Sequence, residues 1–189
     1  MTKTHSRRLV ILALLIVPLL AATQTVTAQG PQPQISELSN ISTRAFVQTG
    51  DNVMIAGLIV QGTEPKRVII RALGPELTQY GVPDALANPT LELHDGTGLL
   101  IASNDNWVRT IIGGIITQNQ VRDIINSGYA PSNGLESAII ADLPPGNYTA
   151  IVRGFNDTVG VALVEVYDLS PSPTPSPTPI IAPSPTTTP

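Results

Sequence analysis

The sequence predicts an all-β domain, an antiparallel β-sandwich or jelly roll of about eight strands with one short helix. Between residues 35 and 169, short runs rich in Val, Ile, Leu and Thr recur, and clusters of Gly, Pro, Asn and Asp separate them at close spacing. Such runs and turns are typical of strands joined by tight connections. Strands and helices do not alternate along the chain, which argues against a parallel α/β sheet.

Apolar patterning places the expected strands. Residues 53–60 are continuously apolar, which predicts a strand that is covered on both faces. Side chains alternate in 66–73 and in 90–94, and the second alternation directs Leu91 and Leu93 inward. The other expected strands are 41–47, 99–103, 136–142, 147–154 and 161–168.

Turn residues and one helical pattern join these strands. Residues 95–98 read Asp-Gly-Thr-Gly, which predicts a short hairpin connection with glycine where a positive φ is needed. Residues 117–126 are the best helix candidate, capped by Thr117 or Asn119 and ended near Gly128. A helical turn is expected at 77–80.

The N-terminus, residues 1–28, has the layout of a cleavable signal peptide. A positive segment ending at Arg7 and Arg8 precedes an apolar stretch at 9–22, and small residues then lead to cleavage after Ala28. The apolar stretch is shorter than a bilayer span, and Pro18 interrupts it, which argues against an uncleaved anchor. The expected location is secreted, extracellular or periplasmic, without membrane insertion after cleavage.

Two proline-containing segments flank the expected domain at 35–169. Residues 29–34 form a short polar linker, and 170–189 form a tail in which eight prolines alternate mostly with Ser and Thr. Such a tail favours extended polyproline II and cannot bury enough apolar surface to fold. It is therefore expected to be a disordered spacer.

Composition excludes several classes of site and partner. The chain has no cysteine, so lipoprotein anchors, disulfides and thiolate metal sites are excluded. Removal of the signal leaves seven basic residues against 14 acidic ones, and the basic residues are scattered. Nucleic acid and anionic membranes are therefore poor partners.

Catalysis is not expected. His94 is the single histidine after signal removal, and alternation turns it outward beside Glu92, without an oriented partner. No nucleophile elbow, metalloprotease motif or phosphate loop is present. The nearest carboxylate pairs, Glu92 with Asp95 and Glu136 with Asp142, lack the aromatic neighbours that sugar clefts favour.

A run of oxygen-bearing side chains, Asn104-Asp105-Asn106, raises the question of calcium. Asp95 lies at the far end of an extended strand, about 15–20 Å away, which is too far to share an ion with Asp105. The candidate ligands are therefore Asp105 and Asn104 with Asn88 or Asp84. Because carboxylates are few, the sequence favours a plain Asx turn here, with no cofactor.

Trp107 follows this run directly. It either caps the edge of the core or presents an aromatic platform to a sugar or peptide. Capping is favoured, because no other aromatic side chain is near in sequence and an indole buries a large area.

Two segments resemble a known family. Residues 91–106, which read Leu-Glu-Leu-His-Asp-Gly-Thr-Gly-Leu-Leu-Ile-Ala-Ser-Asn-Asp-Asn, are similar to the central hairpin of bacterial pre-peptidase C-terminal domains. Residues 143–154 resemble the strand that follows it. The resemblance implies a secreted, non-catalytic β-sandwich of the kind usually appended to hydrolases. It covers about the second half of the domain.

Residues 38–45 and 70–75 resemble a recurrent module of exported bacterial proteins of unassigned function. Those modules often sit beside repeat or enzymatic regions, and no such region is recognised in residues 1–34 or 170–189, so the chain is expected to be either a stand-alone version or a fragment of a longer architecture. The expected function is an exported, non-catalytic structural or adhesive module at or outside the cell surface. The alternative is a calcium-assisted module that binds an extracellular protein or carbohydrate.

Overall fold

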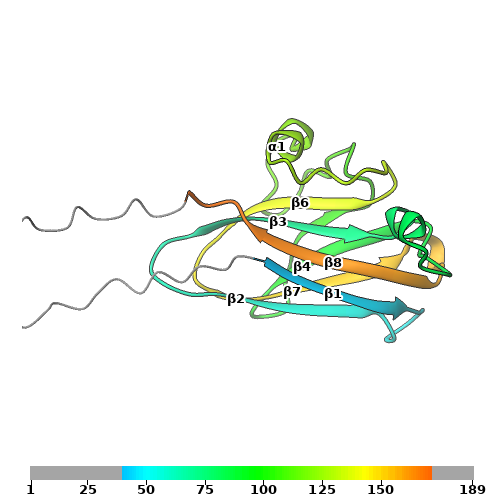
Figure 1. The fold of residues 1–189 in the computed structure, drawn as a ribbon. Coiled ribbons are helices and arrows are strands. Elements are labelled where there is room, and N and C mark those ends of the chain that lie inside the picture. Colours follow the sequence, from blue (N-terminus) through cyan, green and yellow to red (C-terminus); the bar gives the residue numbers. More distant parts are fainter. Residues whose placement is uncertain (1–39, 172–189) are drawn as a thin grey trace, which may run out of the picture. The chain divides into compact units, whose positions relative to one another are not determined.

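The computed structural model describes residues 40–171, which hold eight strands, one α-helix and two short 3-10 helices (Figure 1). The strands form two four-stranded antiparallel sheets. The predicted all-β fold class is confirmed. The signal peptide expected at 1–28, the linker at 29–34 and all but the first two residues of the tail lie outside the described residues.

The two sheets have the strand pairing of a jelly roll. The first has the order β1-β8-β3-β6 and the second β2-β7-β4-β5. The pairs β1–β8, β2–β7, β3–β6 and β4–β5 are those of one long antiparallel ribbon folded over on itself. The strands are β1 Asn40–Val47, β2 Met54–Val60, β3 Lys66–Leu73, β4 Pro89–Asp95, β5 Leu100–Asn104, β6 Ser137–Leu143, β7 Gly146–Gly154 and β8 Gly160–Asp168.

The main core lies between the two sheets. Leu91 and Leu93 of β4 are fully buried there, as are Val68 and Ile70 of β3. Their neighbours in sequence point to the outer faces, so the alternation predicted for 66–73 and 90–94 is confirmed.

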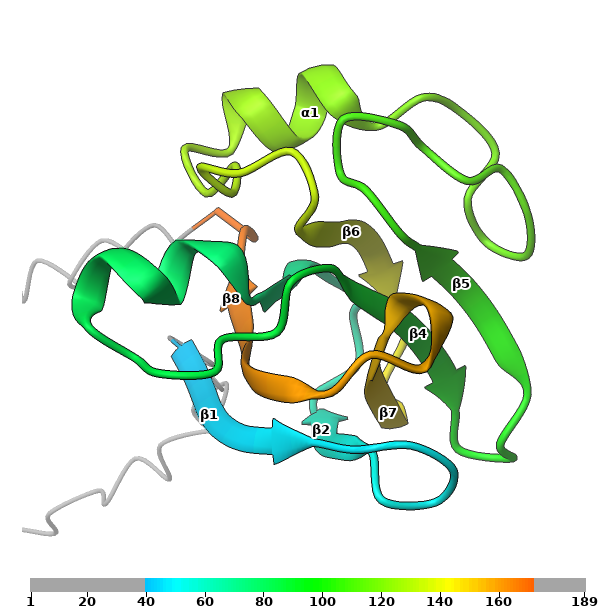
Figure 2. The same cartoon turned by 90° about the vertical axis from the view of Figure 1, so that its right-hand side faces the viewer.

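A smaller cluster covers the outer face of the first sheet. Ile69 points away from the main core and is nevertheless fully buried. Ile124 of α1 (Val121–Asn126) packs with it, together with Ala138 and Ile140 of β6. Figures 1 and 2 show α1 lying over β6 on this side. The helix therefore buries apolar side chains that one sheet face would otherwise expose.

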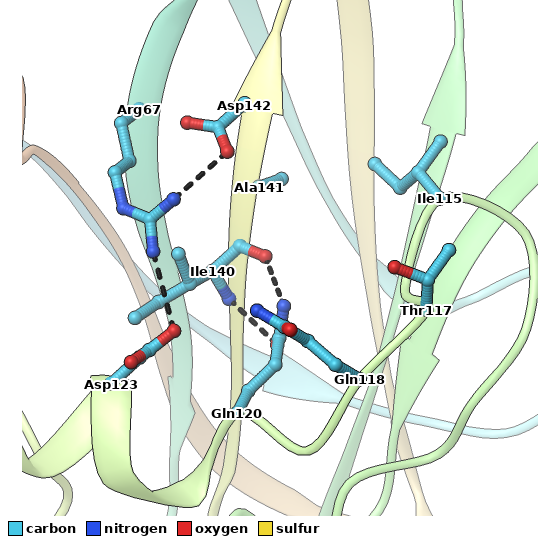
Figure 3. Close-up of a pocket in the computed structure, with 9 residues that line it drawn as sticks. All are labelled: Arg67, Ile115, Thr117, Gln118, Gln120, Asp123, Ile140, Ala141 and Asp142. Carbon is cyan, nitrogen blue, oxygen red and sulfur yellow. Dashed lines mark hydrogen bonds and ion pairs between the residues drawn. The ribbon is translucent and has the colours of Figure 1, made fainter.

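The helix begins at Val121, later than the start expected at residue 117. Gln120 is used in another way: its Nε2 donates to the Ile140 carbonyl (2.6 Å), and its Oε1 accepts from the Ile140 N–H (3.1 Å). Figure 3 shows this amide against the backbone of β6. Because β6 is an edge strand, the Gln120 amide stands where a further strand would pair.

The prediction that the strand at 53–60 is covered on both faces is wrong. Met54, Leu58 and Val60 of β2 are buried, whereas Ile55 and Ile59 are each 60% exposed. β2 is an edge strand of the second sheet, and its outward side chains face solvent at these positions. An unbroken apolar run does not separate a strand covered on both faces from an edge strand with an apolar outer face.

The first and last strands of the described chain lie side by side. Asn40 pairs with Tyr167, so β1 begins beside the end of β8. Beyond β8, the Leu169 N–H donates to the Arg67 carbonyl (2.7 Å), and Ser170 Oγ accepts from the Arg67 N–H (3.2 Å). The chain is therefore bonded to β3 as far as Ser170.

Candidate functional site

The loops at one end of β4 and β5 bring together residues that the sequence singled out. The two strands pair as far as Leu91 and Asn104. Beyond that pair, Ser137 Oγ lies 2.8 Å from the Pro89 carbonyl oxygen and 3.0 Å from the Asn104 carbonyl oxygen. Asn88 and Asp105 are the next residues on these two segments. Both therefore lie at the same end of the hairpin.

Three side-chain oxygens at this end are buried and have no hydrogen-bond partner. They are Oδ1 of Asn88, Oδ1 of Asp105 and Oδ1 of Asn106. No other buried side-chain nitrogen or oxygen atom of residues 40–171 lacks a partner. Buried polar atoms in native proteins are nearly always satisfied, so this concentration needs a physical explanation. All three atoms are oxygens, so a complementary group must donate a proton or carry positive charge.

Asn104 and Asp84, the other two predicted ligands, have different surroundings. The Asn104 Nδ2 donates to the Arg109 carbonyl (2.9 Å), and its Oδ1 accepts from the Ala138 N–H (3.2 Å). Its buried side chain therefore ties the loop to β6. Asp84 is exposed, and its backbone carbonyl accepts from the Val161 N–H (2.7 Å). The structure gives neither side chain a free oxygen that is buried with the other three.

Asn106 joins the set although it was not among the named candidate ligands. Asp105 and Asn106 are adjacent, and alternation along an extended chain would separate their side chains. After β5 the chain turns instead, and the Arg109 N–H donates to the Asn106 carbonyl (2.8 Å). The chain also bends at Asp105, immediately after the strand ends, so strand alternation does not apply there, and both oxygens are buried. The one sequence signal that could have included Asn106 among the candidate ligands was its place in the run Asn104-Asp105-Asn106.

Trp107 is partly buried against the small apolar cluster that contains Ile69 and Ile124. Its indole N–H donates to the Asn133 carbonyl (3.0 Å), and its backbone N–H donates to the Glu136 carbonyl (2.7 Å). These contacts fit the capping role, and they also fix the chain that follows Asn106.

Comparisons with known proteins place this geometry in context. No family model matches the chain, and no curated protein matches it. Among solved structures, a similar one is the pre-peptidase C-terminal domain of a collagenase from Bacillus anthracis. It is 17% identical, the match covers 68% of this chain and 89% of that one, and the TM-score is 0.37. At this similarity the match assigns neither family membership nor an activity to this chain.

No three His, Cys, Asp or Glu side chains of the described residues gather into a group that could hold a metal ion. Across residues 40–171, no helix is both long and apolar enough to cross a membrane.

Glu136 is the most deeply buried carboxylate near the site. It accepts hydrogen bonds from the backbone N–H groups of Gly74 (3.1 Å), Glu76 (2.8 Å) and Asn133 (3.4 Å). Burial raises the pKa of Glu136 above its usual value, although these three hydrogen bonds oppose the rise. The carboxylate thereby joins the start of β6 to the 3-10 helix at Pro75–Tyr80.

The hairpin side chains are also engaged in local contacts. His94 Nε2 lies 3.2 Å from Glu92 Oε2, and its Nδ1 lies 3.1 Å from the Gly98 carbonyl oxygen. Asp95 accepts from the Thr97 hydroxyl and the backbone N–H groups of Thr97 and Leu99. Hydrogen bonds from Thr97 lower the pKa of Asp95. This carboxylate therefore holds the turn that the sequence predicted.

A polar hollow beside β6 holds one more group of charges (Figure 3). Arg67 lies 2.9 Å from Asp142 and 3.4 Å from Asp123, so its guanidinium bridges two carboxylates. All three side chains are substantially exposed, and such pairs contribute little to stability. One guanidinium against two carboxylates leaves this group about one negative charge, which does not favour an anionic ligand here.

Proposed function

We propose that this chain is an exported, non-catalytic β-sandwich module that acts as a structural or adhesive domain at or outside the cell surface. The observation that carries the proposal is the use of its acidic side chains. Glu136 accepts three backbone N–H groups, Asp95 holds a hairpin, and Glu165 pairs with Arg71. Each of these carboxylates is engaged within the fold.

The spacing of one candidate carboxylate pair and the local contacts of the other also support a non-catalytic role. Glu136 and Asp142 lie at opposite ends of β6, about 20 Å apart at the rise of an extended strand. Glu92 lies beside His94 and Arg153, whereas Asp95 turns into the hairpin. Glycoside hydrolysis requires two carboxyl groups about 5–10 Å apart across the scissile bond.

The adhesive part of the proposal is supported by an apolar surface next to β5, here called the isoleucine surface. Leu100 and Ile111 line the same shallow hollow, and the Ile115 N–H donates to the Ile101 carbonyl (2.8 Å). We define the isoleucine surface as the exposed side chains Leu100 and Ile111 in this hollow, together with the exposed Leu99, Ile112 and Ile115, which lie next in sequence to residues that line it. Exposed apolar clusters often mark interaction sites. Because these side chains are aliphatic, an extracellular protein is favoured over a carbohydrate as the partner.

Export rests on the sequence pattern of residues 1–28, and the acidic surface of the mature chain argues against nucleic acid as a partner. The second candidate function is calcium-assisted binding of an extracellular protein or carbohydrate. The three buried oxygens of Asn88, Asp105 and Asn106 favour it.

The mature protein is expected to give no turnover with panels of generic esterase, peptidase and glycosidase substrates. The reason is that its carboxylates and His94 are held in local contacts and not aimed together at a cleft. Glu92→Gln and His94→Ala serve as matched variants on one strand. Turnover that disappears in either variant would contradict a non-catalytic role.

Binding to an array of extracellular proteins is expected to depend on the isoleucine surface. Ile112→Asp should weaken it at least about tenfold, because a charge there must be desolvated against an apolar partner. Ile125→Asp is the control, since Ile125 on α1 is 55% exposed and Ile112 is 57% exposed. Equal loss in both variants, or binding only to polysaccharides, would show that this surface does not carry adhesion.

A further inference from the structure

We infer that the three buried oxygens of Asn88, Asp105 and Asn106 form a site for a divalent cation of the calcium type. This proposal deepens the second candidate function and does not depend on the adhesive role. It rests on the burial of these atoms, on their chemistry and on the way in which the fold fixes the two segments that carry them.

The three buried atoms are all oxygens of the type that calcium binds. One carboxylate oxygen and two amide oxygens are hard, neutral or negative donors, which is the ligand set that Ca²⁺ takes. No Lys or Arg forms a hydrogen bond or ion pair with these three side chains among the described residues. Burying a carboxylate oxygen without a partner is costly, and a cation removes that cost.

Hydrogen bonds hold in place the two segments that carry the three oxygens. Pro89 and Asn104 are tied to the buried Ser137 hydroxyl, and the Asn88 carbonyl accepts from the Phe155 N–H (2.9 Å). Asn104 is tied to Ala138 through its amide. Both segments are therefore held by β6 and by Phe155, the residue that follows β7, independently of any ligand. Such a site requires little ordering when a ligand binds.

The affinity of the site for calcium follows from the number of its carboxylates. A single carboxylate gives a weak site, of the millimolar to tenth-millimolar class that extracellular calcium modules show. Backbone carbonyls and water would complete the coordination shell. Mg²⁺ is less suitable, because it requires near-ideal octahedral geometry and retains its water. The site would thus fill where free calcium is in the millimolar range.

Trp107 makes the site directly observable. It follows Asn106 and is the only tryptophan of the chain. Tb³⁺ replaces Ca²⁺ at oxygen sites and emits when a nearby indole is excited. We expect tryptophan-sensitised terbium emission from the mature protein, and excess calcium should displace it. Asp105→Asn should abolish the emission, whereas Asp95→Asn, which alters a half-buried carboxylate in the turn between β4 and β5, should leave it unchanged.

Thermal melts provide a second measurement on the same variants. Calcium at about ten to a hundred times Kd should raise the Tm of the wild type by roughly 3–8 °C relative to chelator, since it binds the folded state alone. The rise should vanish in Asp105→Asn and persist in Asp95→Asn. Emission that survives in Asp105→Asn would place the ion elsewhere and overturn the proposal.

Absence of both signals in the wild type would also overturn it. In that case water or the Asn88 and Asn106 amides themselves satisfy the site: turned by 180°, each amide would aim an N–H₂ group where its oxygen now lies. The plain Asx turn favoured by the sequence would then stand.

Discussion

Replacing Glu136 by alanine is expected to lower the Tm of the domain by about 10–20 °C. The carboxylate is fully buried and accepts the N–H groups of Gly74, Glu76 and Asn133. Removing it leaves these donors without an acceptor, at about 1–3 kcal/mol for each group that stays buried, and opens a cavity. A total near 3–5 kcal/mol gives the stated shift for a domain of this size.

Glu92→Ala is the matched control for this prediction, because Glu92 lies on the outer face of β4 and pairs only with partly exposed groups. Its Tm should change by about 2 °C or less. A Glu136→Ala variant that melts like Glu92→Ala would show that the three N–H groups find other acceptors.

The pH dependence of stability tests the same carboxyl group in a folded variant, Glu136→Gln. Burial raises the folded-state pKa of Glu136 above 4.5, so the protonated form is favoured in the folded protein. The contribution of protonated Glu136 to the free energy of unfolding is fully present below pH 4.5, and it is lost as the pH rises through the folded-state pKa. Denaturant melts should therefore show the wild type losing stability relative to Glu136→Gln over that rise. A constant difference would contradict the raised pKa.

Gly74→Ala is expected to cost about 3 kcal/mol or more, with a Tm lower by at least about 10 °C or no folded protein. A Cβ atom on Gly74 would lie 2.1 Å from the Leu86 carbonyl oxygen. Neither the Gly74 backbone nor the Leu86 carbonyl can move away easily. Gly74 is held by Glu136 (3.1 Å), and the Leu86 N–H donates to the Val161 carbonyl (2.8 Å).

Gly57→Ala is the control for Gly74→Ala. Gly57 lies in β2, and a Cβ atom there would meet no other atom within 4 Å. Its Tm should stay the same or rise slightly, because alanine restricts the unfolded chain more than glycine does. Thermal melts and refolding yields compare the two variants. Similar behaviour of both would mean that the loop at Leu86 moves freely away from Gly74.

Local patterns in the sequence predicted the strands well, but of their pairings they predicted only the hairpin of β4 and β5. The strand expected at 66–73 matches β3. The bounds of the other seven strands differ from the expected ones by at most one residue at either end. Alternation and turn residues are local, so they are readable in one sequence. The β1–β8 ladder joins Asn40 to Tyr167, and no local pattern encodes such a pairing. The choice between a sandwich and a jelly roll therefore needed the structure.

The candidate site shows the same division. Asp105 and Asn88 were named from residue type and from the expected hairpin, and both carry buried oxygens without a partner. Asn104 could not be separated from them in sequence, because its amide is used by Ala138, 34 residues away. The late start of α1 has a similar cause, since Gln120 bonds to Ile140 across 20 residues.

The neighbouring ends of β1 and β8 have a mechanical consequence. A force that pulls the domain apart from its two ends acts on the Asn40–Tyr167 pair and on the bonds of Leu169 and Ser170 to Arg67. Hydrogen bonds of an antiparallel ladder run perpendicular to the strands, so this force loads them one after another and not all together. A tether through both ends would therefore peel β1 from β8 at low tension, and β3, paired with β8 on its other side, would still be held.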